Sequence, residues 1–179
     1  MDITKIPPGE NPPEDIHVLI EVPLRSDPIK YEFEKNSGAI FVDRYLYTSM
    51  FYPCNYGFVP NTLYDDGDPV DVLVMGRMPL VPGCILQARP IGVLELEDDG
   101  GQDEKILAVP VPRITSLYKN VHHFSDVPEI ELLRIQHFFE HYKDLEPNKW
   151  TRVGSWRDAD EAKRIVMHSI RMFDDKAKG

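Results

Sequence analysis

One seven-residue stretch constrains the fold most: Asp66-Gly67-Asp68-Pro69-Val70-Asp71-Val72. Its glycine accepts backbone angles that other residues avoid, and its proline has no N–H to donate to a sheet. Residues 66–69 are therefore predicted to form a turn or a strand edge. The apolar run at 70–75 that follows predicts a buried strand. A turn loaded with carboxylates thus leads directly into the core.

The three carboxylates of this turn suggest a metal site, because hard cations such as Mg²⁺ prefer carboxylate oxygens. A regular strand would place Asp66 and Asp68 on one face, about 7 Å apart at their Cα atoms, and Asp71 on the other. The Gly-Pro interruption can break this alternation and bring all three together. A solvated acidic turn is the alternative, since Asp-Gly and Asp-Pro are ordinary loop chemistry. An EF-hand calcium loop fails, because Val70 stands where a ligand is needed.

Length and charge limit the classes of protein. A chain of 179 residues fits one domain, 1–179. A formal net charge of −10 argues against a protein that binds nucleic acid or a membrane surface through its charge. The sequence has no apolar run of membrane-spanning length and no signal-peptide core, so we expect a cytoplasmic protein. The two cysteines, Cys54 and Cys84, are expected to be buried free thiols.

The first two-thirds of the chain are rich in predicted strands. Residues 1–15 contain four prolines and should form an extended arm along the surface. Alternating apolar residues, together with turn residues at 36–38, predict a strand and a hairpin, and the aromatic segment 51–59 indicates a bent strand or an ordered loop. Strands are expected at 16–22, 29–34, 39–45, 70–75 and 105–111, and as two short pieces within 84–96 broken near residues 90–92.

The last third predicts two helices, at 125–143 and 158–173. Ser125 or Asp126 can cap the first helix, and Pro128 suits its first turn. Asp158 followed by Glu161 resembles a capping box that opens the second. Periodicity alone therefore predicts a mainly antiparallel β protein with two C-terminal helices, an α+β class.

A second acidic cluster surrounds Gly100-Gly101 and ends at Lys105. Alone, such a charge run is usually a solvated hairpin tip. Together with the first cluster it can complete a site for several metal ions, with Lys105 facing the substrate. The cluster comprises Glu95, Glu97, Asp98, Asp99, Asp103 and Glu104.

The histidines receive a smaller role. His137 and His141 have the i, i+4 spacing that can bind metal on a helix, but no third ligand stands near them in the sequence. We therefore favour a role in packing or at an interface. His122 and His123 precede the helix in a loop and are assigned no chemistry.

With both acidic clusters placed, the chain resembles the soluble family I inorganic pyrophosphatases in their compact bacterial form. The likeness extends from about Pro7 through the last helix. It rests on the motif at 66–72 and on three further blocks in the expected order: Asp27-Pro28-Ile29-Lys30-Tyr31-Glu32, Phe51-Tyr52-Pro53-Cys54-Asn55-Tyr56-Gly57 and His137-Phe138-Phe139-Glu140-His141-Tyr142-Lys143.

The resemblance implies a fold and an activity. The fold would be a small closed β-barrel of OB-like topology flanked by helices, and members of this size generally assemble as hexamers, with His137 and His141 near an interface. The reaction would be hydrolysis of pyrophosphate to two phosphates with Mg²⁺, for which Mn²⁺ or Zn²⁺ could substitute. Bound cations neutralise this dense polyanion and activate the attacking water.

The resemblance also implies roles for individual residues. Asp68 looks like the proton acceptor for the attacking water. The metal ligands would be Asp66, Asp71, Asp98 and Asp103, with Glu21 and Glu32 as outer ligands. The phosphate-binding set would be Lys30, Arg44, Tyr56, Lys105, Tyr142 and Lys143, with Tyr52, Asp99 and Lys149 as secondary members. Asp99 ranks below the other aspartates because its short side chain reaches a metal only through water.

Three alternatives remain open from the sequence. A metal-dependent phosphoesterase acting on nucleotides uses similar chemistry, and no recognisable base pocket supports it. A nucleic-acid-binding OB-type module would suit the barrel and the aromatic segment, but stacking normally works with a basic groove, which a net charge of −10 disfavours. A catalytically inactive homologue is disfavoured because each position that the family needs carries a suitable residue.

Overall fold

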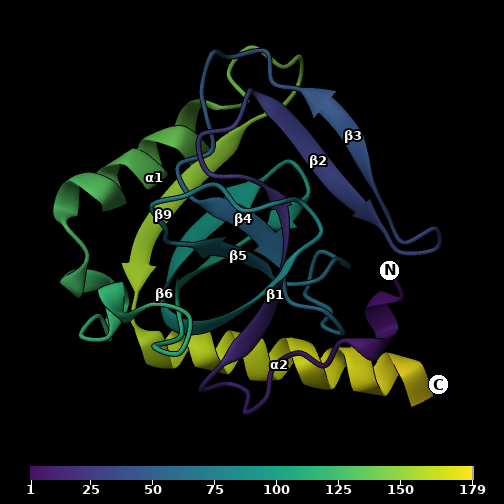
Figure 1. Cartoon of the computed structure of the whole chain (residues 1–179). Helices are drawn as coiled ribbons and strands as arrows, with labels where there is room; N and C mark the ends of the chain where they lie inside the picture. The colour runs from purple at the N-terminus through teal and green to yellow at the C-terminus, as the bar shows by residue number, and fades with distance from the viewer. Residues whose placement is uncertain (179) are drawn as a thin grey trace.

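The computed structural model describes residues 1–178 and shows a strand-rich body with two long helices (Figure 1). Three short 3-10 helices, Ile3–Lys5, Ser116–Tyr118 and Phe124–Asp126, lie in the connections. The strands are β1 (Ile16–Val22), β2 (Ile29–Glu34), β3 (Ala39–Tyr45), β4 (Asn55–Phe58), β5 (Asp71–Val74), β6 (Ile85–Asp98), β7 (Gly101–Gln102), β8 (Lys105–Pro110) and β9 (Thr151–Arg157), and the helices are α1 (Glu129–His141) and α2 (Ala159–Lys178).

The strand pairings of the main sheet run in a ring. β1 pairs with β4, β4 with β5, β5 with β8, β8 with β6, and β6 again with β1. The β5–β8 pair is parallel and the others are antiparallel. β9 and β7 add to β6, whereas β2 and β3 form a separate two-stranded sheet that extends from the body in Figure 1. The chain thus has the predicted mixed α+β architecture.

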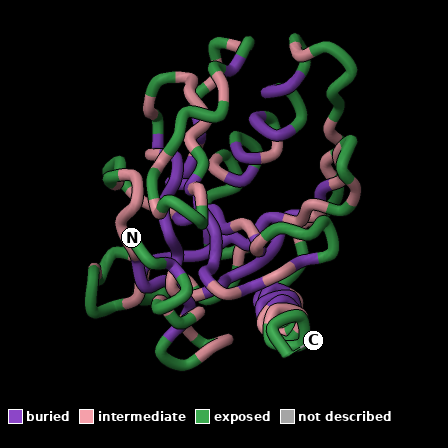
Figure 2. Tube along the Cα trace, turned by 90° about the vertical axis from the view of Figure 1, so that its right-hand side faces the viewer, coloured by how far each residue is buried: buried purple, intermediate pink, exposed green. Residues whose placement is uncertain are grey.

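The core fills both sides of the central strands. The buried residues concentrate in the middle of the molecule and the exposed ones in its outer segments (Figure 2), and β3 is exposed at most of its positions. α2 buries Ala162, Ile165 and Val166 against one face, and α1 buries Ile135 and Phe138 in a second cluster. Burial of such apolar surface is the main stabilising contribution to folding. Neither these helices nor any other in residues 1–178 is long and apolar enough to cross a membrane.

The helix boundaries differ from those predicted. α1 begins at Glu129 rather than at 125, because Pro128 occupies the N-cap and restricts Val127 to an extended conformation. The side chain of Asp126 instead accepts hydrogen bonds from the backbone of His122 and His123, at 2.8 and 2.9 Å. α1 also ends at His141, so residues 142 and 143 lie just past its last full turn.

The second helix is longer than the predicted range 158–173. Asp158 accepts a hydrogen bond from the Glu161 N–H at 2.9 Å, which confirms the predicted start. α2 then continues to Lys178, while Gly179 lies outside the described residues. Lysines at 176 and 178 in its last turn favour the extension by their interaction with the helix dipole.

The strands differ from the prediction in two places. Residues 85–98 form one long strand, β6, because the register shift between Pro90 and Gly92 accommodates the proline without ending the strand. The strand β9 was not predicted at all. Its sequence is polar and contains Gly154, which lies so close to Glu95 of β6 that a Cβ would be 2.9 Å from the Glu95 Cβ.

The N-terminal arm is less extended than predicted. A 3-10 turn forms at Ile3–Lys5, where the Asp2 side chain accepts a hydrogen bond from the Thr4 N–H at 3.2 Å. Ile3 is buried in a small cluster with Leu19, Phe33 and Phe58. The first residues therefore pack against β1, β2 and β4 instead of only lying along the surface.

Candidate active site

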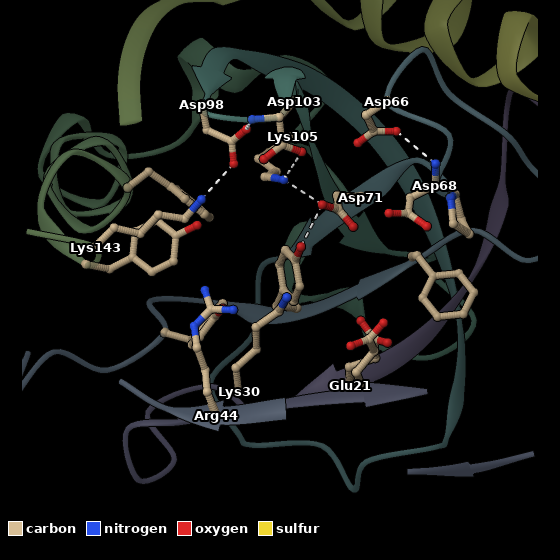
Figure 3. Close-up of a pocket in the computed structure, with 18 of the residues that line it drawn as sticks. Glu21, Lys30, Arg44, Asp66, Asp68, Asp71, Asp98, Asp103, Lys105 and Lys143 are labelled. Carbon is tan, nitrogen blue, oxygen red and sulfur yellow. Dashed lines mark hydrogen bonds and ion pairs between the residues drawn. The ribbon is translucent and has the colours of Figure 1, made fainter. Parts of the chain in front are cut away.

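One cavity of about 370 Å³ opens between the β2–β3 hairpin, the ends of the central strands and the segment after α1. All sixteen side chains proposed for the site from the sequence line this cavity, and Figure 3 shows ten of them labelled. They are Glu21, Lys30, Glu32, Arg44, Tyr52, Tyr56, Asp66, Asp68, Asp71, Asp98, Asp99, Asp103, Lys105, Tyr142, Lys143 and Lys149.

The turn before β5 presents two of the carboxylates. The Asp68 N–H donates to Asp66 Oδ1 at 2.9 Å, and Gly67 between them has φ of +93°, which only glycine adopts readily. Both side chains lie at the same rim of the cavity as Asp71 (Figure 3). The Gly-Pro interruption thus places all three on one cavity. Burial raises the pKa of Asp66, and the charge of Asp71 adds to it.

A buried lysine joins the first acidic segment to the second. Lys105 Nζ contacts Asp71 Oδ2 at 2.5 Å and also contacts Asp103 Oδ1, and its side chain is only 3% exposed. Parallel pairing of β5 with β8 causes this approach, because it places Asp71 beside Lys105 in register. Burial alone would lower the pKa of Lys105, but the charges of the two aspartates outweigh it and raise the pKa. Burial raises the pKa of Asp103 to about 6, against the attraction of Lys105.

The remaining aspartates meet lysines that follow α1. Lys143 Nζ donates to Asp98 Oδ2 at 2.6 Å and lies 3.6 Å from Asp99 Oδ1, and Lys149 pairs with Asp99. Burial alone would raise the pKa of Asp98, but the hydrogen bond from Lys143 outweighs it, so the pKa is lowered. Lys143 lies just past the end of α1 and contacts Asp98 at the end of β6.

The β2–β3 hairpin supplies cations to the opposite side of the cavity. Lys30 and Arg44 are direct partners in the pairing of β2 with β3. Asp43 lies 3.2 Å from Lys30 Nζ and 2.8 Å from Arg44 Nη1, and Arg44 Nε donates to Glu146 Oε1 at 3.2 Å. In Figure 3 these two cations lie across the cavity from the aspartates.

Buried polar groups form the floor. Glu21 is 7% exposed and accepts a hydrogen bond from the Phe33 N–H at 2.8 Å. Burial raises the pKa of Glu21 to about 8, although that hydrogen bond works against the shift. The Tyr56 hydroxyl donates to Asp71 Oδ2 at 2.6 Å, and burial raises the pKa of both Tyr56 and Tyr52, so these hydroxyls are protonated donors at neutral pH.

The carboxylates are not arranged as a metal cage. Among residues 1–178, no group of three or more His, Cys, Asp or Glu side chains is placed to hold a metal ion. The physical reason is visible in the ion pairs, because Lys105 sits between Asp71 and Asp103, and Lys143 contacts Asp98. The donor set nevertheless suits a divalent cation, because carboxylate oxygens are the ligands that such cations prefer. The pKa of Asp103 is raised by burial even beside Lys105, so additional positive charge at this carboxylate would favour its ionised form.

Three charged residues near the site escaped the sequence reasoning. Asp43 and Glu146 contact Arg44, and Lys35 lines the cavity from the hairpin turn. Arg44 and Glu146 are 102 positions apart, so no local pattern signals their contact. The four histidines discussed above do not line the cavity in the described part of the chain. The rings of His137 and His141 lie 4.6 Å apart on α1, and His141 Nδ1 lies 2.8 Å from Asp144.

Comparisons with known proteins identify the chain's relatives. The family model described as inorganic pyrophosphatase matches residues 18–174. An inorganic pyrophosphatase of Agrobacterium fabrum is 58% identical, covering 97% of this chain and 98% of the relative, and one of Brucella melitensis is 56% identical, covering 100% and 99%. The crystal structure of inorganic pyrophosphatase from Thermus thermophilus matches with a TM-score of 0.92 and 40% identity, covering 97% of this chain and 99% of that one. The chain therefore belongs to the inorganic pyrophosphatase family.

Proposed function

We propose that this chain hydrolyses inorganic pyrophosphate to two phosphates in the cavity described above. One observation carries the proposal beyond family membership: a wall of carboxylates faces a set of lysine, arginine and tyrosine donors across about 370 Å³. Donors such as Lys30, Arg44 and Lys143 suit phosphate oxygens, while the carboxylates suit the cations that a phosphoanhydride requires. Both are needed to bring water to a polyanion.

The phosphate-binding side acts by position and charge. Lys30, Arg44, Tyr142 and Lys143 line one cavity, from β2, from β3 and from the segment just past α1. In this proposal they grip the substrate and stabilise negative charge on the leaving phosphate. To do so, Arg44 must exchange its contacts with Asp43 and Glu146 for phosphate oxygens.

Asp68 is the proposed proton acceptor. It lines the cavity, and its carboxylate makes none of the ion pairs that occupy Asp71, Asp98 and Asp103. An available carboxylate Oδ beside the substrate can take the proton from the attacking water as the new P–O bond forms. Lys105 and Tyr56 hold Asp71 in place beside it.

Membership of this family implies dependence on a divalent cation, which we propose to be Mg²⁺, with Mn²⁺ or Zn²⁺ as substitutes. Asp66, Asp71 and Asp103 would hold one ion, with Asp71 shared with a second, Asp98 and Asp103 would hold another, and Glu21 and Glu32 would serve as outer ligands. When bound, such ions neutralise the substrate and lower the pKa of the attacking water.

The finer expectations about assembly and location remain proposals. The ring of strand pairings supports a small barrel of the OB type. Ile130 and Leu133 on α1 are 61% and 51% exposed, which supports burial of this face in an oligomer, proposed as a hexamer. Light scattering coupled to gel filtration would measure the mass of the assembly. The cytoplasmic location stays a prediction.

The proposal is tested by phosphate release from pyrophosphate by the purified protein, with Mg²⁺ and with a chelator. ATP and a nitrophenyl phosphate ester serve as competing substrates. We expect fast release from pyrophosphate, dependent on the metal, and little from the others. Activity on the esters alone would instead favour the phosphoesterase, and inactivity on every substrate would favour an inactive homologue.

A further inference from the structure

A buried hydroxyl lies where the acidic turn joins the sheet. β4 and β5 pair in register as far as Phe58 and Asp71. At the next pair, the Val59 N–H donates to the Val70 carbonyl at 3.1 Å. A regular antiparallel pair would exchange a second hydrogen bond, from the Val70 N–H to the Val59 carbonyl. Thr62 takes the place of that bond: the Val70 N–H donates to Thr62 Oγ1 at 3.1 Å, and this hydroxyl donates to the Val59 carbonyl at 2.6 Å.

A hydroxyl can bridge the two strands because it is both a donor and an acceptor. Thr62 is 3% exposed, so its contacts are shielded from water. The inserted oxygen also separates the two backbones, which are joined by one direct hydrogen bond and, beside it, by two hydrogen bonds in series across Thr62 Oγ1. The strands therefore part on one side at this pair, and the hydroxyl sets how far.

The segment that leaves the sheet here carries the acidic turn. The Tyr64 N–H donates to the Asp68 carbonyl at 2.7 Å, and the Asp68 N–H donates to Asp66 Oδ1 at 2.9 Å. A single residue separates this closed turn from each end of the hydroxyl bridge. Asp71 lies beyond the bridge, at the start of β5, and all three carboxylates face one cavity (Figure 3). A change in the bridge must therefore move the first two carboxylates relative to the third.

The other side of this segment is held by α2. The Leu63 N–H donates to the Ser169 carbonyl at 3.0 Å, and the Ser169 hydroxyl donates to the Ile165 carbonyl within the helix at 2.9 Å. The helix thus holds the backbone next to Thr62 through a carbonyl and not through a side chain. With its neighbour fixed in this way, Thr62 sets the distance from the segment to β5.

We propose that Thr62 is a positioning residue, whose hydroxyl sets the spacing between Asp71 and the turn that carries Asp66 and Asp68. The inference rests on the proposed function, which assigns these carboxylates to a divalent cation and to the attacking water. The hydroxyl bonds to backbone groups of the acidic wall, whereas the proposed phosphate donors stand on β2, on β3 and after α1. Its loss should therefore weaken cation binding and turnover and leave the KM for magnesium pyrophosphate unchanged.

The test compares Thr62→Val and Thr62→Ser with the unaltered protein. Valine keeps the shape of the side chain and removes the bridge, whereas serine keeps the hydroxyl. Binding of Mn²⁺ is measured by calorimetry without substrate, and kcat and KM are measured separately with Mg²⁺. We expect Mn²⁺ affinity and kcat to fall by about tenfold in Thr62→Val, as for other supports of metal ligands, and to recover in Thr62→Ser.

Ser169→Ala is the matched control. It also removes a fully buried hydroxyl together with its hydrogen bond, but the backbone carbonyl that accepts from the Leu63 N–H remains. It should lower stability toward urea and change neither Mn²⁺ affinity nor kcat. Urea unfolding of each variant also establishes that the protein is folded under the conditions of the assays.

Several results would overturn the role of Thr62. They are unaltered Mn²⁺ affinity in Thr62→Val, an equal loss in Ser169→Ala, a loss that Thr62→Ser does not restore, or a loss expressed in KM alone. If Thr62→Val fails to fold, Thr62→Cys decides the matter, because a thiol is only a weak donor and acceptor. Mn²⁺ affinity equal to that of Thr62→Ser would then refute the bridge. A failure of the proposed function appears differently: the unaltered protein would release no phosphate from pyrophosphate, whatever its affinity for Mn²⁺.

Discussion

The two walls of the cavity hold their charges in different ways. The acidic wall stands at the ends of β5, β6 and β8, in the ring of paired strands, and its lysine is 3% exposed. The cationic wall stands partly on β2 and β3, a separate sheet, and the side chains of Lys30 and Arg44 are 27% and 31% exposed. A rigid wall suits groups that must hold fixed spacing, whereas a more exposed one suits groups that exchange carboxylates for substrate.

The difference also appears in the electrostatics. On the acidic wall, burial raises the pKa of Asp66 and Asp103, so these two carboxylates are short of positive charge, whereas Lys143 lowers the pKa of Asp98. On the cationic wall, Asp43 and Glu146 already satisfy Arg44. The acidic wall can therefore accept added cations, whereas on the cationic wall Arg44 is already paired with carboxylates that a substrate would have to displace.

Replacing Lys105 with Met should have the largest effect, because it removes a buried cation and leaves Asp71 and Asp103 facing each other. Breaking a buried pair typically costs about 3–5 kcal/mol in the free energy of unfolding. We expect a loss of that order in urea unfolding with a chelator, and partial recovery when Mg²⁺ is added. Lys163→Met, which removes a partly exposed pair with Glu14, should cost less than about 1 kcal/mol. Equal losses in the two variants would contradict the contrast between the walls.

Replacing Asp68 with Asn keeps the shape of the acidic wall and weakens the proposed proton acceptor. Turnover should fall by roughly 100-fold, the usual contribution of a positioned general base. The measurement is steady-state phosphate release at saturating Mg²⁺ and pyrophosphate. Asp65→Asn, at the residue directly before Asp66, is the control and should keep its turnover. Near-native turnover in Asp68→Asn would remove Asp68 from the role of base.

The cationic wall should respond less strongly. Arg44→Lys keeps the charge but loses the planar fork that now divides between Asp43 and Glu146. Loss of one hydrogen bond to a charged group, about 1.5 kcal/mol, predicts an increase in KM for magnesium pyrophosphate of about tenfold, with a smaller fall in kcat. Arg134→Lys on the exposed face of α1 provides the comparison. If Arg44→Lys matches the unaltered protein in both constants, Arg44 does not bind phosphate.

The contrast between the walls also explains what the sequence could predict. The positions of β1, β2 and β3 follow from local alternation, and the residues expected at the site line one cavity because each short motif places its own side chains. The partners of those residues depend on contacts between distant segments. Glu146 contacts Arg44 across 102 positions of the chain, and β9 pairs with β6 at Gly154, where a Cβ would come 2.9 Å from the Glu95 Cβ.

The proposed metal site depends on the assembled fold in the same way. A pattern of aspartates predicts which oxygens gather, and it cannot show that Lys105 will come between Asp71 and Asp103. That depends on the parallel register of β5 and β8, a property of the assembled sheet. The start of α1 differs for a local reason instead, since Pro128 at the N-cap delays the helix to Glu129.

A further predicted effect concerns pH and the floor of the cavity. Burial raises the pKa of Glu21 to about 8 from its ordinary value of 4.5, so the folded protein keeps a proton that the unfolded chain has lost in this interval. The free energy of unfolding should therefore fall as pH rises between these two values, by up to about 1.4 kcal/mol per pH unit, and level off above the folded value. Glu21→Gln should remove this slope.

Unfolding in a chelator between about pH 6.5 and 8 isolates Glu21, because the pKa of Asp103 is raised only to about 6 and its contribution is complete below this window. Contributions from groups other than residue 21 are common to both proteins and cancel in the difference. Glu34→Gln is the control: hydrogen bonds from the Asn36 and Ser37 N–H groups lower the pKa of Glu34, which places its titration below the window. Parallel pH profiles for Glu21→Gln and the unaltered protein would mean that Glu21 is already ionised at neutral pH, and that the floor needs no added cation to hold it.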